Sequence, residues 1–370
     1  PGAANRPPGT PSLAAPPGGG TASSAALAGR RPVAAWLLAC CALVFAMVVV
    51  GGVTRLTHSG LSIVEWQPFI GTMLAGRLTG ILPPLDDADW AAQFEKYKLT
   101  PEFKLRNHDM DVEGFKSIFW WEYFHRLLGR LIGVAYFVPF AWFWARGRLD
   151  GPLAAKLGGI FVLGGLQGAM GWYMVKSGLV DDPQVSQFRL TAHLGLALLI
   201  HAAMFWVAHQ VLRPAPSGAP AGLRRAGLAF AALVFAMALT GGLVAGIRAG
   251  FAYNTWPLMN GQWVPAEILL IEPWWRNFGY NMATVQFVHR TLALLVLAFA
   301  WLLAWRVLAD RACTQEARTA AWILAVATLG QVVLGILTLL MVVPVGLGAA
   351  HQGGAVVVLT AALWLARALR

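Results

Sequence analysis

The chain has 370 residues, of which 58% are hydrophobic and only 12% are charged. A soluble domain contains about 25% charged residues, so this composition excludes an ordinary soluble enzyme. The 40 glycines and 21 prolines follow no triplet period, which excludes collagen, and the long apolar runs exclude disorder except at the ends. The sequence is therefore that of an integral membrane protein.

In chain order, the first feature is a segment over residues 1–31 that is rich in Pro, Gly, Ala and Ser and has no acidic residue. We interpret it as a disordered tail on the inner side of the membrane. Eight apolar stretches follow, each close to the roughly 20 residues that a membrane-spanning helix needs. They cover roughly 33–51, 119–144, 157–175, 190–210, 226–244, 284–305, 319–341 and 349–366.

The net charge of +11 is divided unevenly between the two sides of this predicted topology. With the N-terminus inside, the inner side holds 14 Lys and Arg and three acidic residues, whereas the outer side holds 14 of each sign. Short basic loops face the cytoplasm, so the basic excess is explained by topology and nucleic-acid binding is not expected. We expect a bacterial inner-membrane protein with both termini in the cytoplasm; the mitochondrial inner membrane is the alternative.

The first outer loop, roughly 52–118, is long enough to have a structure or function of its own. We predict a short helix over 86–98 that lies at the membrane interface and covers the first site described below; a solvated loop is the alternative. The acidic cluster at 86–89 is single and is expected to be solvated surface. Because the chain has only this one cluster, it lacks the two Asp-rich motifs of a polyprenyl transferase.

The two halves of the chain carry the same landmarks in the same order. The segment EYFHRLLGR at 122–130 matches QFVHRTLAL at 286–294, and TAHLGLALL at 191–199 matches AAHQGGAVV at 349–357. His125 is as far from His289 along the chain as Gln167 is from Gln331, and His193 is only slightly closer to His351. Such similar offsets indicate a duplication, and four spans in each half make the repeats parallel.

We therefore predict an all-α polytopic membrane protein, with eight transmembrane helices arranged as two pseudo-symmetric four-helix bundles. The N-terminal bundle covers 32–210, an inner linker covers 211–225, and the C-terminal bundle covers 226–370. In a bundle whose helices run up and down in turn, the second and fourth helices lie diagonally opposite each other across the core.

Four of the eight histidines lie in the first turns of the even-numbered spans and therefore at one depth: His125, His193, His289 and His351. Ionisable residues inside a membrane are costly and generally functional. A zinc site needs three or four clustered ligands, whereas two opposed histidines suit the iron of a six-coordinate haem. We predict one such site in each half, between the two histidines of that half. His201 and His209 have no counterparts and are expected to be structural.

Two arginines, Arg126 and Arg290, directly follow site histidines at the outer ends of their spans. We expect their guanidinium groups to pair with haem propionates, because guanidinium matches the geometry of a carboxylate. Snorkelling of these side chains toward the membrane surface is the alternative.

The halves differ at one site position, where Glu122 stands three residues before His125 and Gln286 stands three residues before His289. This spacing places both side chains on one helix face. A carboxylate can take a proton or stabilise positive charge, whereas an amide only forms hydrogen bonds. We therefore predict that the first half is the reacting site, with Glu122 as the catalytic residue, and that the second half holds a fixed redox cofactor. The alternative is that Glu122 is a helix-start acid favoured by the helix dipole.

With these features the sequence resembles the haem A synthases, the Cox15/CtaA family, over about residues 33–366. The shared motifs are TRLTHSGLS (54–62), EYFHR (122–126), AHLG (192–195), NTWPLMNG (254–261), FVHR (287–290) and AHQG (350–353). Members of this family oxidise a methyl group of haem O, through a hydroxymethyl, to the formyl group of haem A for terminal oxidase assembly. The resemblance implies that His289 and His351 bind a permanent haem b, that His125 and His193 hold the substrate haem, and that Glu122 is needed for turnover.

The resemblance also implies that haem O and membrane lipid are partners, with haem O synthase and cytochrome oxidase assembly factors as candidate protein partners; a homo-oligomer is left open. One branch of the family has a cysteine pair in its outer loops. This chain has only Cys40, Cys41 and Cys313, so it resembles the branch that lacks the pair. The alternative function is a bis-histidine dihaem b-type quinol oxidoreductase. It needs haems near opposite membrane faces, and four histidines at one depth argue against it.

Overall fold

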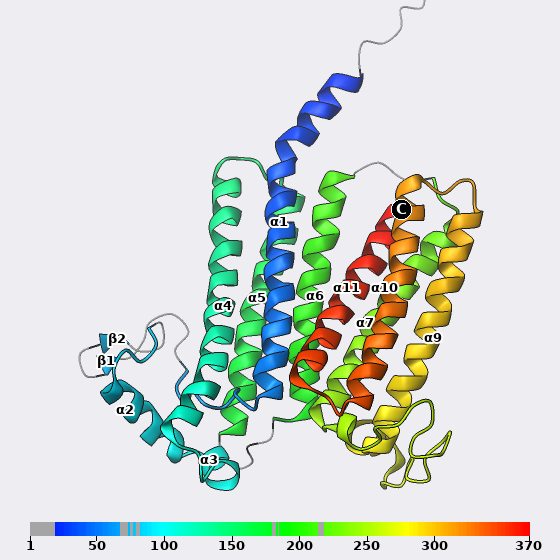
Figure 1. Cartoon of the computed structure of the whole chain (residues 1–370). Helices are drawn as coiled ribbons and strands as arrows, with labels where there is room; N and C mark the ends of the chain where they lie inside the picture. The colour runs from blue at the N-terminus through cyan, green and yellow to red at the C-terminus, as the bar shows by residue number, and fades with distance from the viewer. Residues whose placement is uncertain are drawn as a thin grey trace, which may run out of the picture.

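The computed structural model describes residues 19–66, 73–74, 77–78, 82–179, 183, 185–213 and 218–370. Long helices run side by side and form the body of the molecule, and the smaller elements lie at the end opposite the C-terminus (Figure 1). Eight helices in the described ranges are long and apolar enough to cross a membrane. The prediction of an all-α membrane protein with eight spans is confirmed.

The long helices are α1 (Gly19–Leu56), α4 (Val112–Ala145), α5 (Gly151–Gly178), α6 (Gln187–Leu212), α7 (Ala221–Gly246), α9 (Met282–Ala309), α10 (Gln315–Leu340) and α11 (Val345–Ala368). The short elements are β1 (Met73–Leu74), β2 (Arg77–Leu78), α2 (Asp87–Lys98), α3 (Pro101–Arg106), η1 (Ala249–Phe251), η2 (Trp274–Arg276) and α8 (Asn277–Tyr280). Strands β1 and β2 pair antiparallel.

The structure corrects the expected tail at 1–31, because α1 already begins at Gly19. The stretch that follows Gly19 is rich in alanine, which has the highest helix propensity, so the first span extends backward as one helix. Residues 1–18 lie outside the described part of the chain. The linker expected at 211–225 is also shorter than predicted, since α6 ends at Leu212 and α7 begins at Ala221.

Side-chain caps fix where several spans begin. The side chains of Asp111, Asp150, Asn281 and Thr314 accept hydrogen bonds from backbone N–H groups in the first turns of α4, α5, α9 and α10. Each cap satisfies one of the free N–H groups that every helix start exposes. The spans themselves are apolar on nearly all sides, as expected for helices that face either lipid or other helices.

Each half of the chain forms a closed ring of four neighbouring helices. In the first half α1 packs against α4 and α6, and α5 packs against the same two helices; in the second half α7 and α10 pack in the same way against α9 and α11. The halves meet where α6 contacts α7 and where α11 contacts α1, with α6 also touching α11. This contact pattern supports the predicted duplication, which stays a prediction.

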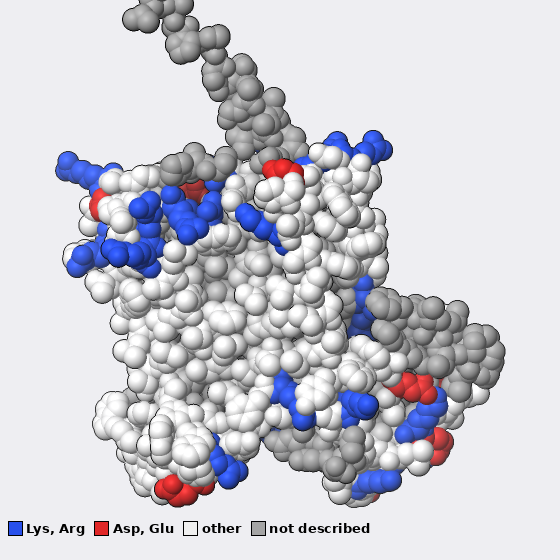
Figure 2. Space-filling view, turned by 180° about the vertical axis from the view of Figure 1, so that it is seen from behind, with Lys and Arg blue, Asp and Glu red and all other residues white. Residues whose placement is uncertain are grey.

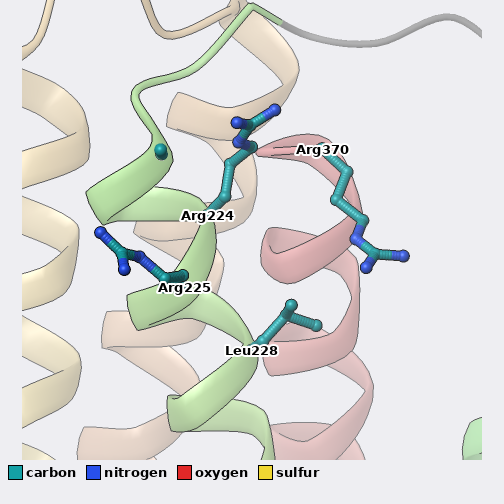
Figure 3. A pocket seen from close by; sticks show the side chains of 5 residues that line it. Arg224, Arg225, Leu228 and Arg370 are labelled. Atoms are coloured by element: carbon teal, nitrogen blue, oxygen red, sulfur yellow. The ribbon is translucent and has the colours of Figure 1, made fainter.

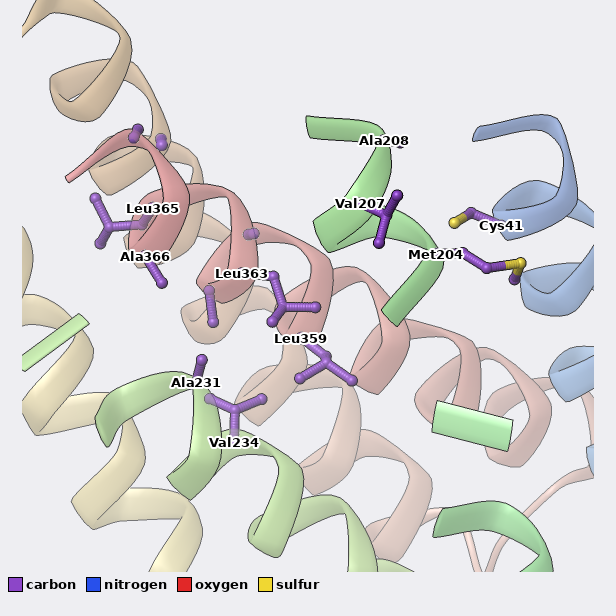
Figure 4. Close-up of a cluster of buried hydrophobic side chains, with 14 of the residues drawn as sticks. Cys41, Met204, Val207, Ala208, Ala231, Val234, Leu359, Leu363, Leu365 and Ala366 are labelled. Atoms are coloured by element: carbon purple, nitrogen blue, oxygen red, sulfur yellow. The ribbon is translucent and has the colours of Figure 1, made fainter. Parts of the chain in front are cut away.

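The main apolar core lies along the seam between the halves and extends into both. Figure 4 shows side chains of α11, among them Leu359 and Leu363, between those of α6 and α7. Leu359 is 1% exposed, and Val234 of α7 is 4% exposed. Because this seam buries large aliphatic side chains, we expect the two halves to move as one unit.

The loop between α1 and α4 contains a small helical cap, which we call the lid: α2, α3 and the connection to α4. Trp90 and Tyr97 of α2 pack on Phe115 and Phe119, which lie in the first three turns of α4. The predicted helix over 86–98 is confirmed as α2, and the fully solvated alternative is wrong for this segment. Its expected place at the membrane interface and over the first site stays a prediction. The acidic cluster is explained locally, since Asp86 caps α2 and accepts a hydrogen bond from Asp89 N.

The two ends of the molecule differ in charge. Figure 2 shows mostly Lys and Arg at the end that carries the C-terminus, and both signs at the end that carries the lid. Which end faces the cytoplasm stays a prediction from the charge distribution.

Candidate functional site

The four predicted site histidines lie on four helices: His125 on α4, His193 on α6, His289 on α9 and His351 on α11. The last three lie in the second or third turn of their helices. The expected position in the first turns is wrong for His125, which lies in the fourth turn of α4 because that helix already begins at Val112. The extra turns of α4 carry the aromatic side chains that bind the lid.

The second-half pair faces across its bundle as predicted. The ring centres of His289 and His351 are 6.5 Å apart, and their planes are nearly perpendicular at 84°. An imidazole nitrogen binds a metal at about 2.0 Å and lies about 1.1 Å from its ring centre, so two imidazoles on opposite sides of one metal have ring centres about 6 Å apart. The observed separation would therefore let His289 and His351 hold one haem iron between them. His125 and His193 are close enough to interact electrostatically.

Each of the four imidazole rings lies against a glycine of a neighbouring helix. A methyl group on any of these glycines would lie between 2.8 and 3.3 Å from a ring atom; the pairs are Gly51 with His125, Gly171 with His193, Gly241 with His289 and Gly335 with His351. A methyl group would require a small shift of the ring at the first three glycines and a larger shift at Gly335. The same contact in both halves keeps the rings close to the helix backbones.

Two glutamines hold the histidines on α6 and α11. The Gln167 amide donates to the carbonyl of His193 at 3.1 Å, and the Gln331 amide donates to the carbonyl of His351 at 2.8 Å. Within the described residues, Gln167 Oε1, Gln331 Oε1 and His193 Nδ1 are buried and have no hydrogen-bond partner. Buried polar atoms normally have partners, so these atoms are consistent with a site that a polar ligand completes.

The chemistry of the donor set decides which ligand fits. No group of three or more His, Cys, Asp or Glu side chains in the described ranges could hold a metal ion. A pair of histidines therefore suits an iron that brings four further nitrogens in a porphyrin. The ring separation, the glycine contacts and the unpartnered polar atoms all fit a haem.

Glu122 is nearly fully buried, with 2% of its surface exposed. Its Oε2 accepts hydrogen bonds from Ser62 Oγ and from the backbone N–H of Ile63, both at 2.7 Å. Its Oε1 pairs with Arg126 at 2.6 Å. Because α4 begins at Val112, Glu122 lies nearly three turns inside the helix, and the alternative of a helix-start acid is wrong. The carboxylate instead ties α4 to the loop that follows α1.

The matching residue of the second half, Gln286, makes a weaker version of this contact. Its Oε1 accepts from Arg290 at 3.1 Å, and its Nε2 donates to the carbonyl of Ala249 at 2.8 Å. Gln286 is as buried as Glu122, with 2% exposed. The halves therefore share one geometry, but only the first half places a carboxylate beside its histidine.

Arg126 and Arg290 hold equivalent loops. Each guanidinium donates to two backbone carbonyls with one residue between them: Ile63 and Glu65 for Arg126, and Tyr253 and Thr255 for Arg290. The two pairs of acceptors are at equivalent positions of the two halves, because the number of residues from Ile63 to Tyr253 equals the number from Glu65 to Thr255. Positioning of these loops is a role that the sequence did not reveal. Pairing with haem propionates stays a prediction.

The packing of the glycine-rich helix α5 differs from that of its counterpart α10. Gly164 follows the buried Leu157 and Ile160 on one face of α5, yet it is exposed, and a methyl group there would touch nothing within 4 Å. When Gln167 is aligned with Gln331, the counterpart of Gly164 is Thr328, which is 2% exposed. Helix α5 also packs less extensively against α4 than α10 does against α9. The first half is therefore the more open of the two.

A buried polar cluster lies in the lid, near Glu122. Tyr97 donates to Glu102 at 3.3 Å and accepts from Asn107 at 2.7 Å. Burial of Glu102, together with repulsion from Glu122, raises the pKa of Glu102 to about 7. Burial also raises the pKa of Tyr97. The second half has no equivalent, because the lid belongs to the longer loop of the first half.

The remaining histidines have protein partners. His201 bonds Thr360 at 2.8 Å and His209 bonds Glu316 at 3.1 Å, so the structural role expected for both is supported by contacts across the seam. His58 bonds Arg248 at 3.2 Å. Burial and nearby arginines lower the pKa of His58.

Sequence reasoning missed several site residues. Gln167 and Gln331 were recognisable only as repeat landmarks, and Ser62 lay within a motif without an assigned role. Thr240, which contacts His289, had a detectable signal: it directly precedes a Gly-Gly pair that recurs in the first half, where Val50 takes its place.

An open pocket of about 650 Å³ lies at the end that carries the C-terminus, far from the histidines along the helices. It is lined by Ala221, Arg224, Arg225, Leu228 and Arg370. Figure 3 shows the three guanidinium groups pointing in different directions. Because they do not converge, we assign no site there.

The fold and the site together define a polytopic α-helical membrane protein with two histidine pairs suited to haem. The sequence model of the COX15-CtaA family, described as cytochrome oxidase assembly protein, matches residues 34–363. The chain belongs to this family.

Curated relatives are similar over most of their length. The chain is 57% identical to the "Heme A synthase" of Nitrosospira multiformis, a match that covers 89% of this chain and 90% of the relative. It is 52% identical to the "Heme A synthase" of Nitrosomonas eutropha, covering 88% and 90%, and 49% identical to that of Rhodospirillum centenum, covering 89% and 86%. The predicted family resemblance is confirmed.

Proposed function

We propose that the protein is a haem A synthase, which oxidises a methyl group of haem O to the formyl group of haem A. Family membership and the names of the relatives support this function. The structural observation that carries it is a difference in charge beside the two histidine pairs, with the carboxylate of Glu122 in the first half and the amide of Gln286 in the second.

We assign the substrate haem to the first half and a resident haem b to the second. His125 and His193 would hold haem O, and His289 and His351 would hold haem b. The more open packing around α5 supports an exchangeable ligand in the first half. When bound, haem b supplies one-electron transfer.

The chemistry releases protons as well as electrons. Oxidation of the methyl group with water to a hydroxymethyl group releases two electrons and two protons, and oxidation of the hydroxymethyl to the formyl releases two of each again. An external electron acceptor must take these electrons. Positive charge develops beside the ring when electrons leave the methyl carbon. Glu122 can stabilise that charge and take a proton, and Ser62 and Arg126 hold its carboxylate in place.

The cellular setting follows from the spans and the relatives. Eight apolar helices and bacterial relatives fit a multi-pass bacterial membrane protein. We further propose the inner membrane, cytoplasmic termini, and contacts with haem O synthase and oxidase assembly factors. The quinol oxidoreductase alternative is not favoured by the relatives.

Extraction of haems from the purified protein tests the proposal. We expect haem b together with haem O or haem A when a haem O synthase is coexpressed. His289→Ala and His351→Ala should lose haem b, and His125→Ala and His193→Ala should lose only haem O and haem A. His201→Ala, which breaks a contact outside both sites, is the control. A wild-type protein without haem would overturn the proposal.

A further inference from the structure

A threonine hydroxyl contacts one of the four paired histidines. Thr240 Oγ1 on α7 lies 2.8 Å from His289 Nδ1. The same hydroxyl donates its proton within its own helix to Met237, whose carbonyl oxygen is 2.8 Å away. A hydroxyl has only one proton to donate. With that proton on the Met237 carbonyl, Nδ1 of His289 is the donor in the Thr240 contact, and the lone pair of the neutral imidazole then lies on Nε2.

The first half lacks this hydroxyl. The carbonyl of Ile63 binds Arg126, and the carbonyl of Tyr253 binds Arg290 in the same way. Aligning the two halves so that Ile63 matches Tyr253 also aligns the Gly-Gly pairs near the ends of α1 and α7. In this register Val50 is the counterpart of Thr240. Valine has nearly the shape of threonine but cannot accept a proton from a histidine.

The two rings are turned differently toward the equivalent helices. A methyl group on Gly241 would lie 3.3 Å from Cε1 and 4.0 Å from Nδ1 of His289, so this ring shows its Nδ1 edge to α7. A methyl group on Gly51 would lie 3.2 Å from Nε2 and 3.5 Å from Cδ2 of His125, so that ring shows its Nε2 edge to α1. His289, beside Thr240, thus turns its Nε2 away from α7. His125, beside Val50, turns its Nε2 toward α1.

We propose that the Thr240/Val50 difference decides which half retains its haem. This inference rests on the proposed function. Thr240 fixes the tautomer and orientation of His289 and makes it a stronger ligand, so the cofactor haem stays bound. Val50 leaves His125 without such support, so substrate and product haem can exchange. Thr240 is a positioning residue that acts through His289.

The physical basis is the hydrogen bond on the non-ligating nitrogen. A hydrogen bond from Nδ1–H raises the basicity of the opposite nitrogen, and loss of such a partner typically weakens metal binding about 10- to 100-fold. A more basic axial ligand favours ferric over ferrous iron, so the same contact lowers the midpoint potential of the haem.

Thr240→Val and Thr240→Ser in the full-length protein test the proposal. Thr240→Val keeps the shape and removes the acceptor, so we expect haem b to dissociate about 10- to 100-fold faster and its midpoint potential to rise. Thr240→Ser restores the hydroxyl and should restore both values. Thr360→Val is the matched control, because it breaks another 2.8 Å threonine–histidine contact, at His201, and should change neither value.

The reciprocal variant, Val50→Thr, tests the first half independently. We expect slower release of haem A, with the potential of haem b unchanged. Wild-type haem b retention and potential in Thr240→Val, or unchanged haem A release in Val50→Thr, would overturn the inference. If the wild-type protein held no haem, the proposed function itself would fail, which distinguishes the two outcomes.

Discussion

At the scale of single residues, Glu122 is the position where charge and geometry can be separated. Glu122→Gln keeps the size of the side chain but removes the negative charge, and it makes the first half resemble the second. Loss of a positioned charge that acts in the transition state costs about 2.7–4 kcal/mol, or about 10²–10³ in rate. We expect haem O to bind and little haem A to form, measured by chromatography of extracted haems.

Two variants control this prediction. Ser62→Ala removes one of the hydrogen bonds to Glu122 but keeps the carboxylate, so we expect a smaller loss than in Glu122→Gln. Gln286→Glu adds a carboxylate to the second half, and we expect haem b to stay unoxidised because that half lacks the lid. Wild-type haem A yield in Glu122→Gln would show that the carboxylate only ties the loop to α4.

At the scale of elements, the lid is what most distinguishes the halves. The chain from Glu65 to Glu122 is much longer than the equivalent chain from Thr255 to Gln286. The extra length forms α2 and α3, which place Glu102 within electrostatic reach of Glu122. The lid therefore adds a titratable group to the first half alone.

The raised pKa of Glu102 predicts how lid stability depends on pH. In the folded lid the pKa is about 7, against a usual value of 4.5. Between pH 4.5 and pH 7, Glu102 is protonated in the folded lid but ionised in the unfolded lid. The free energy of unfolding of the lid therefore decreases as pH rises through this range, by about 3 kcal/mol at most. The groups facing Glu102 are Tyr97, Arg106 and Glu122.

Amide hydrogen exchange over α2 and α3 measures the pH dependence of lid stability. The rates are expressed as protection factors, which correct for the effect of pH on the intrinsic exchange rate. Wild-type protection should be higher at pH 5 than at pH 8. Glu102→Gln can still accept from Tyr97 but does not titrate, so its protection should vary little with pH. Equal slopes in the two proteins would contradict the assignment to Glu102.

The packing difference between α5 and α10 supports a second prediction at this scale. Giving α5 the second-half residues, Gly164→Thr with Gly168→Val, fills the open space beside these two glycines. We expect less bound haem O and less haem A, with haem b at its wild-type level. Gly165→Leu is the matched control, since its counterpart Leu329 is 43% exposed. Unchanged haem O binding in the double variant would show that the open face is not used.

At the scale of the whole molecule, sequence periodicity was sufficient to predict the eight spans, and the repeat singled out four histidines whose role as a site stays a prediction. Span length and apolar runs are local properties, and the shared spacing of the matching landmarks could be read directly from the chain. The carbonyls bound by Arg126 could not be predicted, because they depend on how a loop folds back. Thr240 could be singled out by its place before a repeated Gly-Gly pair, but its contact with His289 depends on how the helix is rotated. Helix α2 was predicted from the length of its loop, but the polar contact between Tyr97 and Glu102 was not.

Orientation in the membrane is the last property of the whole molecule, and it decides which compartment receives the protons released by oxidation. The end with the C-terminus carries the basic excess, so we expect it to face the cytoplasm and the lid to face outward. Leu99 in the lid is 73% exposed, and Ala312 between α9 and α10 is also exposed. In a variant whose three native cysteines are replaced by alanine, Leu99→Cys should react with a membrane-impermeant thiol reagent on intact spheroplasts. Ala312→Cys should react only after permeabilisation, and the opposite pattern would reverse the topology.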